Sequence, residues 1–252
     1  MDFVSERCVN KPLWMRQTTF YIPPFRFLVQ NRQMLNPVRG LEALEGEVIK
    51  LRDDPVVRST VEGRVAEFLE VNDKDSHAWF EELVYCLLTA YSSARLGQLC
   101  VDALCDRGSL LEGPLEDVVE ALRVQGHRFY NKRAEYIVEA RRLAPTLKAT
   151  IQGFSETGEA RAWLVPNVKG LGWKEASHFL RNVGYFDVAI IDRHILSNLR
   201  EHGLIPDDKK GLTKRRYLEY EGILQRMADD LDMSLGEMDL YLWYRKTGEV
   251  LK

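Results

Sequence analysis

Lys174 and Asp192 bring an amine and a carboxylate into one short region of the chain, eighteen residues apart. A lysine amine attacks carbon only in its neutral form, and burial or the positive end of a helix disfavours the ammonium ion. A carboxylate held opposite the amine stabilises positive charge and assists proton transfer. The spacing leaves room for one helix and a return, so the two side chains can face each other. An amine and a carboxylate placed in this way are groups that can support covalent catalysis, and neither needs a metal.

A turn punctuated by glycines precedes the lysine. In "LVPNVKGLGWKEASHFLRNVG" an apolar helix end is followed by Gly170 and Gly172, and a second helix then opens around Lys174. Glycine adopts backbone angles closed to other residues, which permits a very tight link between two helices. In such a helix-hairpin-helix the outward-pointing amides bind a phosphate oxygen, a contact that positions DNA without reading its sequence. We therefore expect Gly170, Gly172 and Trp173 to contact phosphate, and a plain tight turn is the alternative.

The aspartate follows a buried apolar run. "YFDVAIIDRHILSNL" places residues 188–191 directly before Asp192, and a helix starts at Arg193. Aspartate is a favoured N-cap residue, so a purely structural role is one interpretation. Capping and catalysis are compatible, because a capped backbone behind an apolar lead-in holds the carboxylate at the floor of a cleft.

The C-terminal region offers groups that could recognise a planar ring. "SLGE" at 234–237 indicates a capping box that opens a helix. Asp239 and Trp243 then fall at i and i+4 on one helix face, where Trp243 can stack on a base while Asp239 accepts a hydrogen bond. Core packing is the alternative for Trp243. Lys252 follows the helix cap at Gly248, and a terminal lysine is usually a frayed, solvated end.

Helical periodicity positions these groups. Apolar residues recur at steps of three and four in "LEALEGEVIKL", "TVEGRVAEFLEV", "WFEELVYCLLTAYSSARLGQLCVDAL" and "LEDVVEALRVQ". We predict an all-α fold, with an irregular N-terminal arm at 1–40 and a helical domain at 41–252 that contains the hairpin at 166–176. Short loops between many medium helices indicate two lobes with a cleft between them.

Composition excludes several classes of protein. With 252 residues, 45% of them hydrophobic, the chain can form one compact catalytic unit. No run approaches the roughly 18 apolar residues of a membrane span, and the N-terminus lacks a secretory signal, so we expect a cytoplasmic protein. A net charge of −3 argues against a polybasic protein that grips nucleic acid everywhere. Neither a disulfide framework nor a metal cluster is indicated by the four cysteines, Cys8, Cys86, Cys100 and Cys105.

"GLGWK" followed by "IIDRHI" resembles the signature of the helix-hairpin-helix DNA glycosylases, in their bifunctional branch. "WFEELVYCLLTAYSSA", "HRFYNKRAEYIVEAR" and "MDLYLWYRKTGEVLK" are similar to the archaeal-type 8-oxoguanine DNA glycosylase/AP lyase family. The resemblance covers roughly residues 51–252, and nothing in it explains the N-terminal arm. It implies that Lys174 is the nucleophile and Asp192 its partner. It also implies an aromatic at the base pocket, for which Tyr130 is preferred over Phe129, and a role for Lys252 in distinguishing 8-oxoguanine from guanine.

These observations predict an enzyme that excises 8-oxoguanine from double-stranded DNA and cuts the strand at the abasic site. Its base pocket would contain Lys252, Trp243, Asp239 and Tyr130. We expect a monomer associated with the nucleoid, without cofactor or membrane; the glycosylases that hold an iron–sulfur cluster need several cysteines near the C-terminus, where this sequence has none. Two alternatives stay open. The chain could act on another damaged base, or it could be a non-catalytic hairpin module that only binds DNA.

Overall fold

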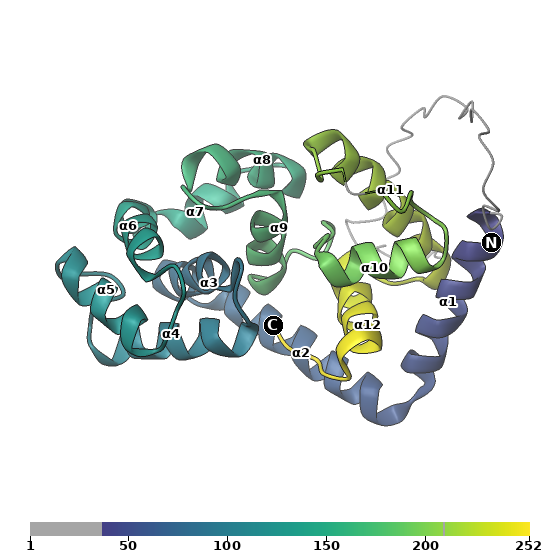
Figure 1. Cartoon of the computed structure of the whole chain (residues 1–252), viewed down its shortest axis with the longest axis horizontal. Coiled ribbons are helices and arrows are strands. Elements are labelled where there is room, and N and C mark those ends of the chain that lie inside the picture. The colour runs from purple at the N-terminus through teal and green to yellow at the C-terminus, as the bar shows by residue number, and fades with distance from the viewer. Residues whose placement is uncertain (1–36, 209) are drawn as a thin grey trace, which may run out of the picture. The chain divides into compact units, whose positions relative to one another are not determined.

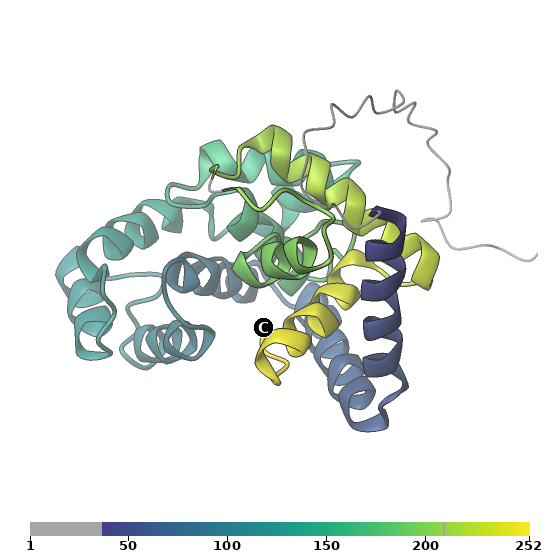
Figure 2. The same cartoon turned by 45° about the vertical axis from the view of Figure 1, so that its right-hand side comes forward.

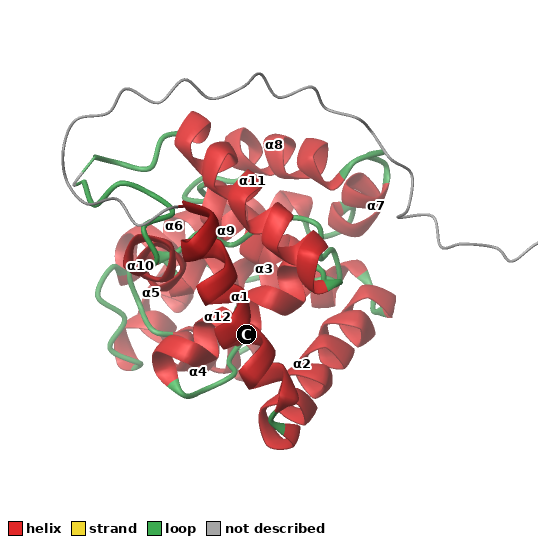
Figure 3. Cartoon of the chain, turned by 90° about the vertical axis from the view of Figure 1, so that its right-hand side faces the viewer, coloured by secondary structure: helices red, strands yellow, loops and turns green. Residues whose placement is uncertain are grey.

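The computed structural model of the chain describes residues 37–208 and 210–252. Within these residues every regular element is a helix and no strand occurs, as the colours of Figure 3 show. The prediction of an all-α fold is confirmed. Of the predicted N-terminal arm, residues 1–36 lie outside the described residues, and residues 37–40 form the start of the first helix.

The helices follow one another through short loops (Figure 1). The first part of the described chain contains α1 (Pro37–Asp53), α2 (Pro55–Asp73), α3 (Ser76–Thr89), α4 (Ala94–Asp106), α5 (Leu115–Val124), α6 (Tyr130–Ala140) and the short 3-10 helix η2 (Arg141–Leu143). The remainder contains α7 (Leu147–Gln152), α8 (Thr157–Asn167), α9 (Trp173–Asn182), α10 (Arg193–Glu201), α11 (Lys214–Leu231) and α12 (Leu235–Thr247).

Side-chain caps determine where several of these helices begin. Asp75 and Ser93 accept hydrogen bonds from first-turn amides of α3 and α4. Ser234 does the same for α12, where its hydroxyl accepts from the amide of Glu237 at 3.1 Å. Each cap satisfies an amide that has no partner inside the helix and contributes about 1 kcal/mol. The N-terminus predicted for the last helix at 234–237 is therefore correct.

Helices α3 to α9 enclose one hydrophobic cluster, which we call the first lobe. Its largest fully buried side chains include Trp79, Tyr85, Phe80 and Phe179. Trp79 and Phe179 meet edge to face, with ring centroids 6.2 Å apart, and so fasten α3 to α9. This packing fixes α9, the helix that carries Lys174, against the body of the lobe.

The second lobe is the cluster formed by α1, α2 and α10 to α12. Leu44, Phe68, Ile195 and Tyr241 are among its buried members. In Figures 1 and 2 these helices gather at the end of the described domain opposite α5 and α6. The prediction of two helical lobes is confirmed. No helix among the described residues is long and apolar enough to cross a membrane.

Candidate active site

The hairpin joins α8 to α9 through residues 168–172. Gly170 has a φ angle of +87°, which residues with a side chain rarely adopt. A Cβ atom at this position would lie 2.3 Å from Cδ2 of Tyr136. Glycine is therefore required here both by the backbone angle and by the close approach of α6.

Some amides of the hairpin are occupied within the chain and others are open. The amide of Leu171 donates to the carbonyl of Val168 at 3.1 Å, and the amide of Gly172 donates to the carboxylate of Glu175 at 3.3 Å. No described residue accepts a hydrogen bond from the amide of Gly170. The open amide and the positive end of α9 form a local site for an anion.

Trp173 has a side chain with a structural role that the sequence pattern did not indicate. Its indole ring contacts two cations, the guanidinium of Arg161 at 4.7 Å and the ammonium of Lys214 at 4.8 Å from the ring centroid. The ring also packs against Tyr217 in the second lobe, at a centroid distance of 6.0 Å. The indole thus connects the hairpin to the second lobe, which leaves the backbone of Trp173 as the part that can meet a phosphate.

Lys174 lies in the first turn of α9, and 27% of its side chain is exposed. Its Nζ lies 3.4 Å from Oε1 of Glu175. The other oxygen of the same carboxylate accepts from the amide of Gly172. Glu175 therefore ties the lysine side chain to the hairpin, a role that the sequence did not indicate.

Asp192 is the N-cap of α10, as its sequence context predicts. Its Oδ1 accepts from the amide of His194 at 2.8 Å and from that of Ile195 at 2.9 Å. Since both bonds end on Oδ1, the second carboxylate oxygen remains available to a ligand. The cap fixes the orientation of the carboxylate at the end of its helix.

The apolar lead-in to the aspartate is held by Tyr217 of α11. Residues 188–191 are buried, as predicted. The hydroxyl of Tyr217 donates to the carbonyl of Ala189 at 2.6 Å and accepts from the amide of Ile191 at 3.2 Å. This extended segment thus gains hydrogen bonds that a strand would otherwise supply, and it leads directly into Asp192.

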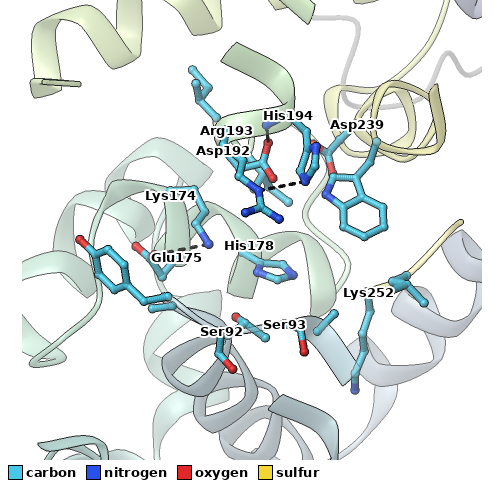
Figure 4. Close-up of a pocket in the computed structure, with 18 of the residues that line it drawn as sticks. Ser92, Ser93, Lys174, Glu175, His178, Asp192, Arg193, His194, Asp239 and Lys252 are labelled. Atoms are coloured by element: carbon cyan, nitrogen blue, oxygen red, sulfur yellow. Dashed lines mark hydrogen bonds and ion pairs between the residues drawn. The ribbon is translucent and has the colours of Figure 1, made fainter. Parts of the chain in front are cut away.

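Lys174 and Asp192 line one pocket, which has a volume of about 1340 Å³. Figure 4 shows the two side chains, one from the first turn of α9 and one from the N-cap of α10. Its wall takes residues from both lobes, including the 89–95 loop, the start of α6, α12 and the C-terminal segment. The volume exceeds the roughly 300–1,000 Å³ of typical small-molecule pockets.

His178 lies one turn after Lys174 and lines the same pocket. Burial, together with the positive charges of Arg181, Lys174 and Lys252, lowers the pKa of this imidazole well below its usual value. The ring is therefore neutral at physiological pH, and its Nδ1 has no hydrogen-bond partner among the described residues. The i, i+4 spacing from the lysine is the signal that could have identified it.

Asp239 is buried in the pocket wall and pairs with Arg181, with 2.9 Å between Oδ2 and Nη1. Burial raises the pKa of Asp239 to about 7, although the charge of Arg181 opposes the shift. The sequence placed Asp239 in the pocket but gave no indication of this partner, 58 residues away. One of its oxygens is therefore already engaged before any ligand arrives.

Trp243 lines the pocket one turn further along α12. Its indole meets the imidazole of His194 edge to face, with centroids 5.6 Å apart. His194 is positioned in turn by Nε of Arg193 at 3.1 Å. Trp243 is only partly buried and lines the pocket.

The opposite rim contains Phe129 and Tyr91. Phe129 lines the pocket, whereas Tyr130 is not among its lining residues and packs half-buried against the first lobe. Tyr91 is 90% exposed and has a φ angle of +63°, a strained conformation for a residue with a side chain. The rings of Tyr91 and Phe129 meet edge to face at 6.3 Å. The structure thus places Phe129, and not Tyr130, at the pocket wall, and adds Tyr91.

Lys252 also lines the pocket, and its ammonium is not solvated freely. Its Nζ lies 2.6 Å from Oε1 of the buried Glu82. The ring of Tyr85 lies below the same ammonium at 4.7 Å, and its hydroxyl donates to the carbonyl of Lys252 at 2.6 Å. The alternative of a frayed end does not describe this residue.

Within the described part of the chain, no group of three or more His, Cys, Asp or Glu side chains is arranged to hold a metal ion. Cys86 and Cys100 are buried, and burial raises the pKa of each thiol. Their chemistry is that of inert core residues. Cys8 lies outside the described residues.

The two lobes, the glycine hairpin and the pocket beside it define the helix-hairpin-helix DNA glycosylase fold. Residues 61–233 match the family described as 8-oxoguanine DNA glycosylase. The chain belongs to this family.

Relatives and solved structures agree with this assignment. The 8-oxoguanine DNA glycosylase/AP lyase of Methanocaldococcus jannaschii is 46% identical over 78% of this chain and 93% of its own length. That of Korarchaeum cryptofilum is 45% identical over 84% of this chain and its full length. The M. jannaschii enzyme in complex with 15mer DNA containing 8-oxoguanine superposes with a TM-score of 0.78, at 44% identity, over 83% of this chain and all of that chain. The structure of the Thermotoga maritima 8-oxoguanine DNA glycosylase superposes with a TM-score of 0.76, at 42% identity, over 84% of this chain and all of that chain.

Proposed function

We propose that this protein is a bifunctional DNA repair enzyme that excises 8-oxoguanine from double-stranded DNA and cleaves the strand 3′ to the resulting abasic site. The observation that carries the proposal is the convergence of Lys174 and Asp192 on one pocket wide enough for an extruded nucleotide. A base inside a duplex is out of reach, so the enzyme must turn the nucleotide out of the stack. One chain supplies every group required, and it acts as a monomer.

Lys174 is the nucleophile of the proposed reaction. Its neutral amine attacks C1′ of the deoxyribose, the C1′–N9 bond breaks, and the departing base takes the bonding electrons and a proton. Glu175, 3.4 Å from the ammonium, is the nearest carboxylate that can accept a proton from Lys174. The sugar ring then opens to give a Schiff base between Nζ and C1′.

Strand cleavage follows from the Schiff base. Loss of a proton from C2′ pushes electrons toward the iminium, and the bond between C3′ and its phosphate oxygen breaks by β-elimination. The phosphate leaves with the electron pair, and hydrolysis later releases the lysine. Each step requires only proton transfers, for which the carboxylates of Asp192 and Glu175 stand at the pocket wall.

Asp192 stabilises the transition state of base release. As the C1′–N9 bond breaks, positive charge develops on the sugar ring. The capped carboxylate has one oxygen free of the helix, and a fixed negative charge near C1′ lowers the energy of that state. Because the cap already orients the group, no reorganisation is needed at the moment of reaction.

Recognition of 8-oxoguanine takes place at the part of the pocket that contains Lys252 and Asp239. This base differs from guanine by an oxygen at C8 and a proton on N7, so an acceptor aimed at N7 selects the lesion. Trp243 and Phe129 provide flat surfaces on either side of the pocket, and Lys252 and Asp239 provide the polar groups. Arg181 engages Oδ2 of Asp239, which leaves Oδ1 for the base.

The hairpin and the rim hold the duplex. The open amide of Gly170 and the first turn of α9 bind a backbone phosphate near the lesion. Tyr91, exposed at the mouth of the pocket, contacts the bases next to the space that the nucleotide leaves. Such contacts fix position without reading sequence.

Borohydride trapping on duplexes with single lesions tests the proposal. Wild-type protein should form a covalent adduct on 8-oxoguanine duplexes and on abasic duplexes, and Lys174→Gln should form none. An adduct on other lesions but not on 8-oxoguanine would show a glycosylase for another damaged base. The absence of an adduct on every duplex, with DNA binding retained, would show a non-catalytic DNA-binding protein.

A further inference from the structure

Glu82 of α3 is a buried acid next to the pocket, and no part of the proposed chemistry uses it. Its side chain is 8% exposed. One carboxylate oxygen accepts from Nζ of Lys252 at 2.6 Å, and the other accepts from Nδ2 of Asn182 at 2.9 Å. The acid thus has a partner on each oxygen, one in the C-terminal segment and one at the end of α9.

Further hydrogen bonds connect Asn182 to the second lobe. Oδ1 of Asn182 accepts from Nε of Arg181 at 3.1 Å, and Nη1 of Arg181 donates to Asp239 at 2.9 Å. All three side chains are buried. Lys252, Glu82, Asn182, Arg181 and Asp239 therefore form an unbroken chain of hydrogen bonds, which we call the buried relay.

Each end of the buried relay is a pair of oppositely charged groups, Lys252 with Glu82 and Arg181 with Asp239, and the neutral amide of Asn182 joins the two pairs. A buried charge that loses one partner is strongly destabilised, whereas a fully paired network is rigid. The two ends of the relay, Lys252 and Asp239, both line the pocket. The relay therefore holds Lys252 and Asp239 in fixed positions relative to each other, through Glu82 and Asn182, which do not line the pocket themselves.

The C-terminal segment depends on these contacts because it passes from one lobe to the other. Val250 packs in the second lobe. Glu249 pairs with Arg95 of α4 at 2.5 Å, and the carbonyl of Lys252 accepts from Tyr85 of α3. Glu82 is the buried carboxylate that pairs with the ammonium of Lys252, while Tyr85 contacts the same ammonium through its ring and the backbone carbonyl through its hydroxyl.

We propose that Glu82 is a positioning residue for base selection: through the buried relay it holds Lys252 and Asp239 in the arrangement that distinguishes 8-oxoguanine from guanine. This inference rests on the proposed function. Glu82 does not touch the substrate. It acts through Lys252, so its removal should affect recognition of the base and spare the chemistry at C1′.

A double-mutant cycle tests the proposal. Glu82→Gln, Lys252→Gln and the double variant are assayed by single turnover on 8-oxoguanine, undamaged guanine and preformed abasic duplexes. Glu82→Gln should lower the ratio of 8-oxoguanine to guanine excision by about tenfold, the effect of losing a hydrogen bond to a charged group, with cleavage of abasic sites changed less than about twofold. The double variant should be no worse than Lys252→Gln.

A second readout does not depend on any activity. Amine acetylation mapped by mass spectrometry should label Lys252 faster in Glu82→Gln than in wild-type protein. Glu81→Gln, on the same helix but without a hydrogen bond to Lys252 among the described residues, is the matched control and should change neither readout. Asn182→Ala should change the excision ratio and the labelling rate of Lys252 in the same direction as Glu82→Gln, but by a smaller factor.

Unchanged labelling of Lys252 in a folded Glu82→Gln variant would overturn the proposal. The proposal would also be overturned if the double variant lost selectivity by the product of the two single losses, because the two residues would then act independently. A wild-type protein that leaves 8-oxoguanine intact would contradict the proposed function instead, and the labelling of Lys252 would still decide whether Glu82 positions it.

Discussion

Lys174 lies in the first turn of α9 and Asp192 is the N-cap of α10, and both residues line one pocket. Each position is fixed locally, the lysine by the glycine hairpin and the aspartate by its cap. The segment 183–191 between the helices brings the two ends together. The proposed reaction depends on this relationship, because the attacking amine and the stabilising carboxylate must approach the same sugar from separate supports.

Replacement of Asp192 by Asn should separate capping from catalysis. Asparagine is as good an N-cap as aspartate, so the melting temperature should stay close to that of wild-type protein. Base release should slow by about a hundredfold or more, since the negative charge near C1′ is lost, while the Kd for a lesion duplex changes little. Single-turnover excision and fluorescence anisotropy provide the two numbers. Equal losses in both would contradict the assignment of Asp192.

Replacement of Gly170 by Ala should destabilise the hairpin. The residue would be forced to a positive φ angle, and its Cβ would meet the ring of Tyr136. We expect a loss of roughly 1–3 kcal/mol in the free energy of unfolding, measured by urea denaturation.

Gly63→Ala is the matched control for that experiment. Gly63 lies in α2, where an added Cβ has no atom within 4 Å. Alanine there should stabilise the protein by about 0.5–1 kcal/mol. We therefore expect the free energy of unfolding to fall in Gly170→Ala and to rise in Gly63→Ala. An unchanged free energy of unfolding in Gly170→Ala would show that the turn does not need its glycine.

His178 should make stability depend on pH. Burial and nearby cations lower the pKa of this imidazole in the folded protein. An unfolded histidine titrates at about 6.5, so the unfolded chain takes up a proton that the folded protein refuses. The free energy of unfolding should therefore fall as the pH drops below about 6.5, by at most about 1.4 kcal/mol per pH unit from this residue.

His178→Gln should remove that part of the pH dependence, and the exposed His77→Gln should leave it intact. Denaturation at pH 7.5 and 5.5 gives the comparison. The imidazole signals of His178 by NMR provide a direct check, and protonation near pH 6.5 would refute the prediction.

Tyr91→Ala should weaken excision but not strand cleavage at preformed abasic sites. The exposed ring lies at the pocket mouth, so its loss should hinder extrusion of a paired base. We expect about tenfold slower excision of 8-oxoguanine from a duplex. Tyr91→Phe, which keeps the ring, is the control and should behave as wild type; equal losses for both variants would point to the hydroxyl.

The sequence predicted those parts of the site that depend on local patterns. The glycine turn, the cap at Asp192 and the helix that carries Trp243 each lie within a few residues of their signals. Helical periodicity likewise predicted the all-α fold.

Contacts between distant residues could not be predicted in this way. Glu82 and Lys252 are 170 residues apart, and nothing in the spacing of either indicates the other. Phe129 and Tyr130 are neighbours in the sequence, and no sequence pattern separates Phe129, which lines the pocket, from Tyr130, which packs against the first lobe. The indole of Trp173 was likewise placed by residues of the second lobe.

Mass-spectrometric mapping of the borohydride-reduced adduct tests the central claim most directly. Wild-type protein is reduced on an 8-oxoguanine duplex, digested, and the peptide that carries the sugar remnant is sequenced. The account predicts the remnant on Nζ of Lys174. A remnant on Lys252 or on any other amine would contradict it.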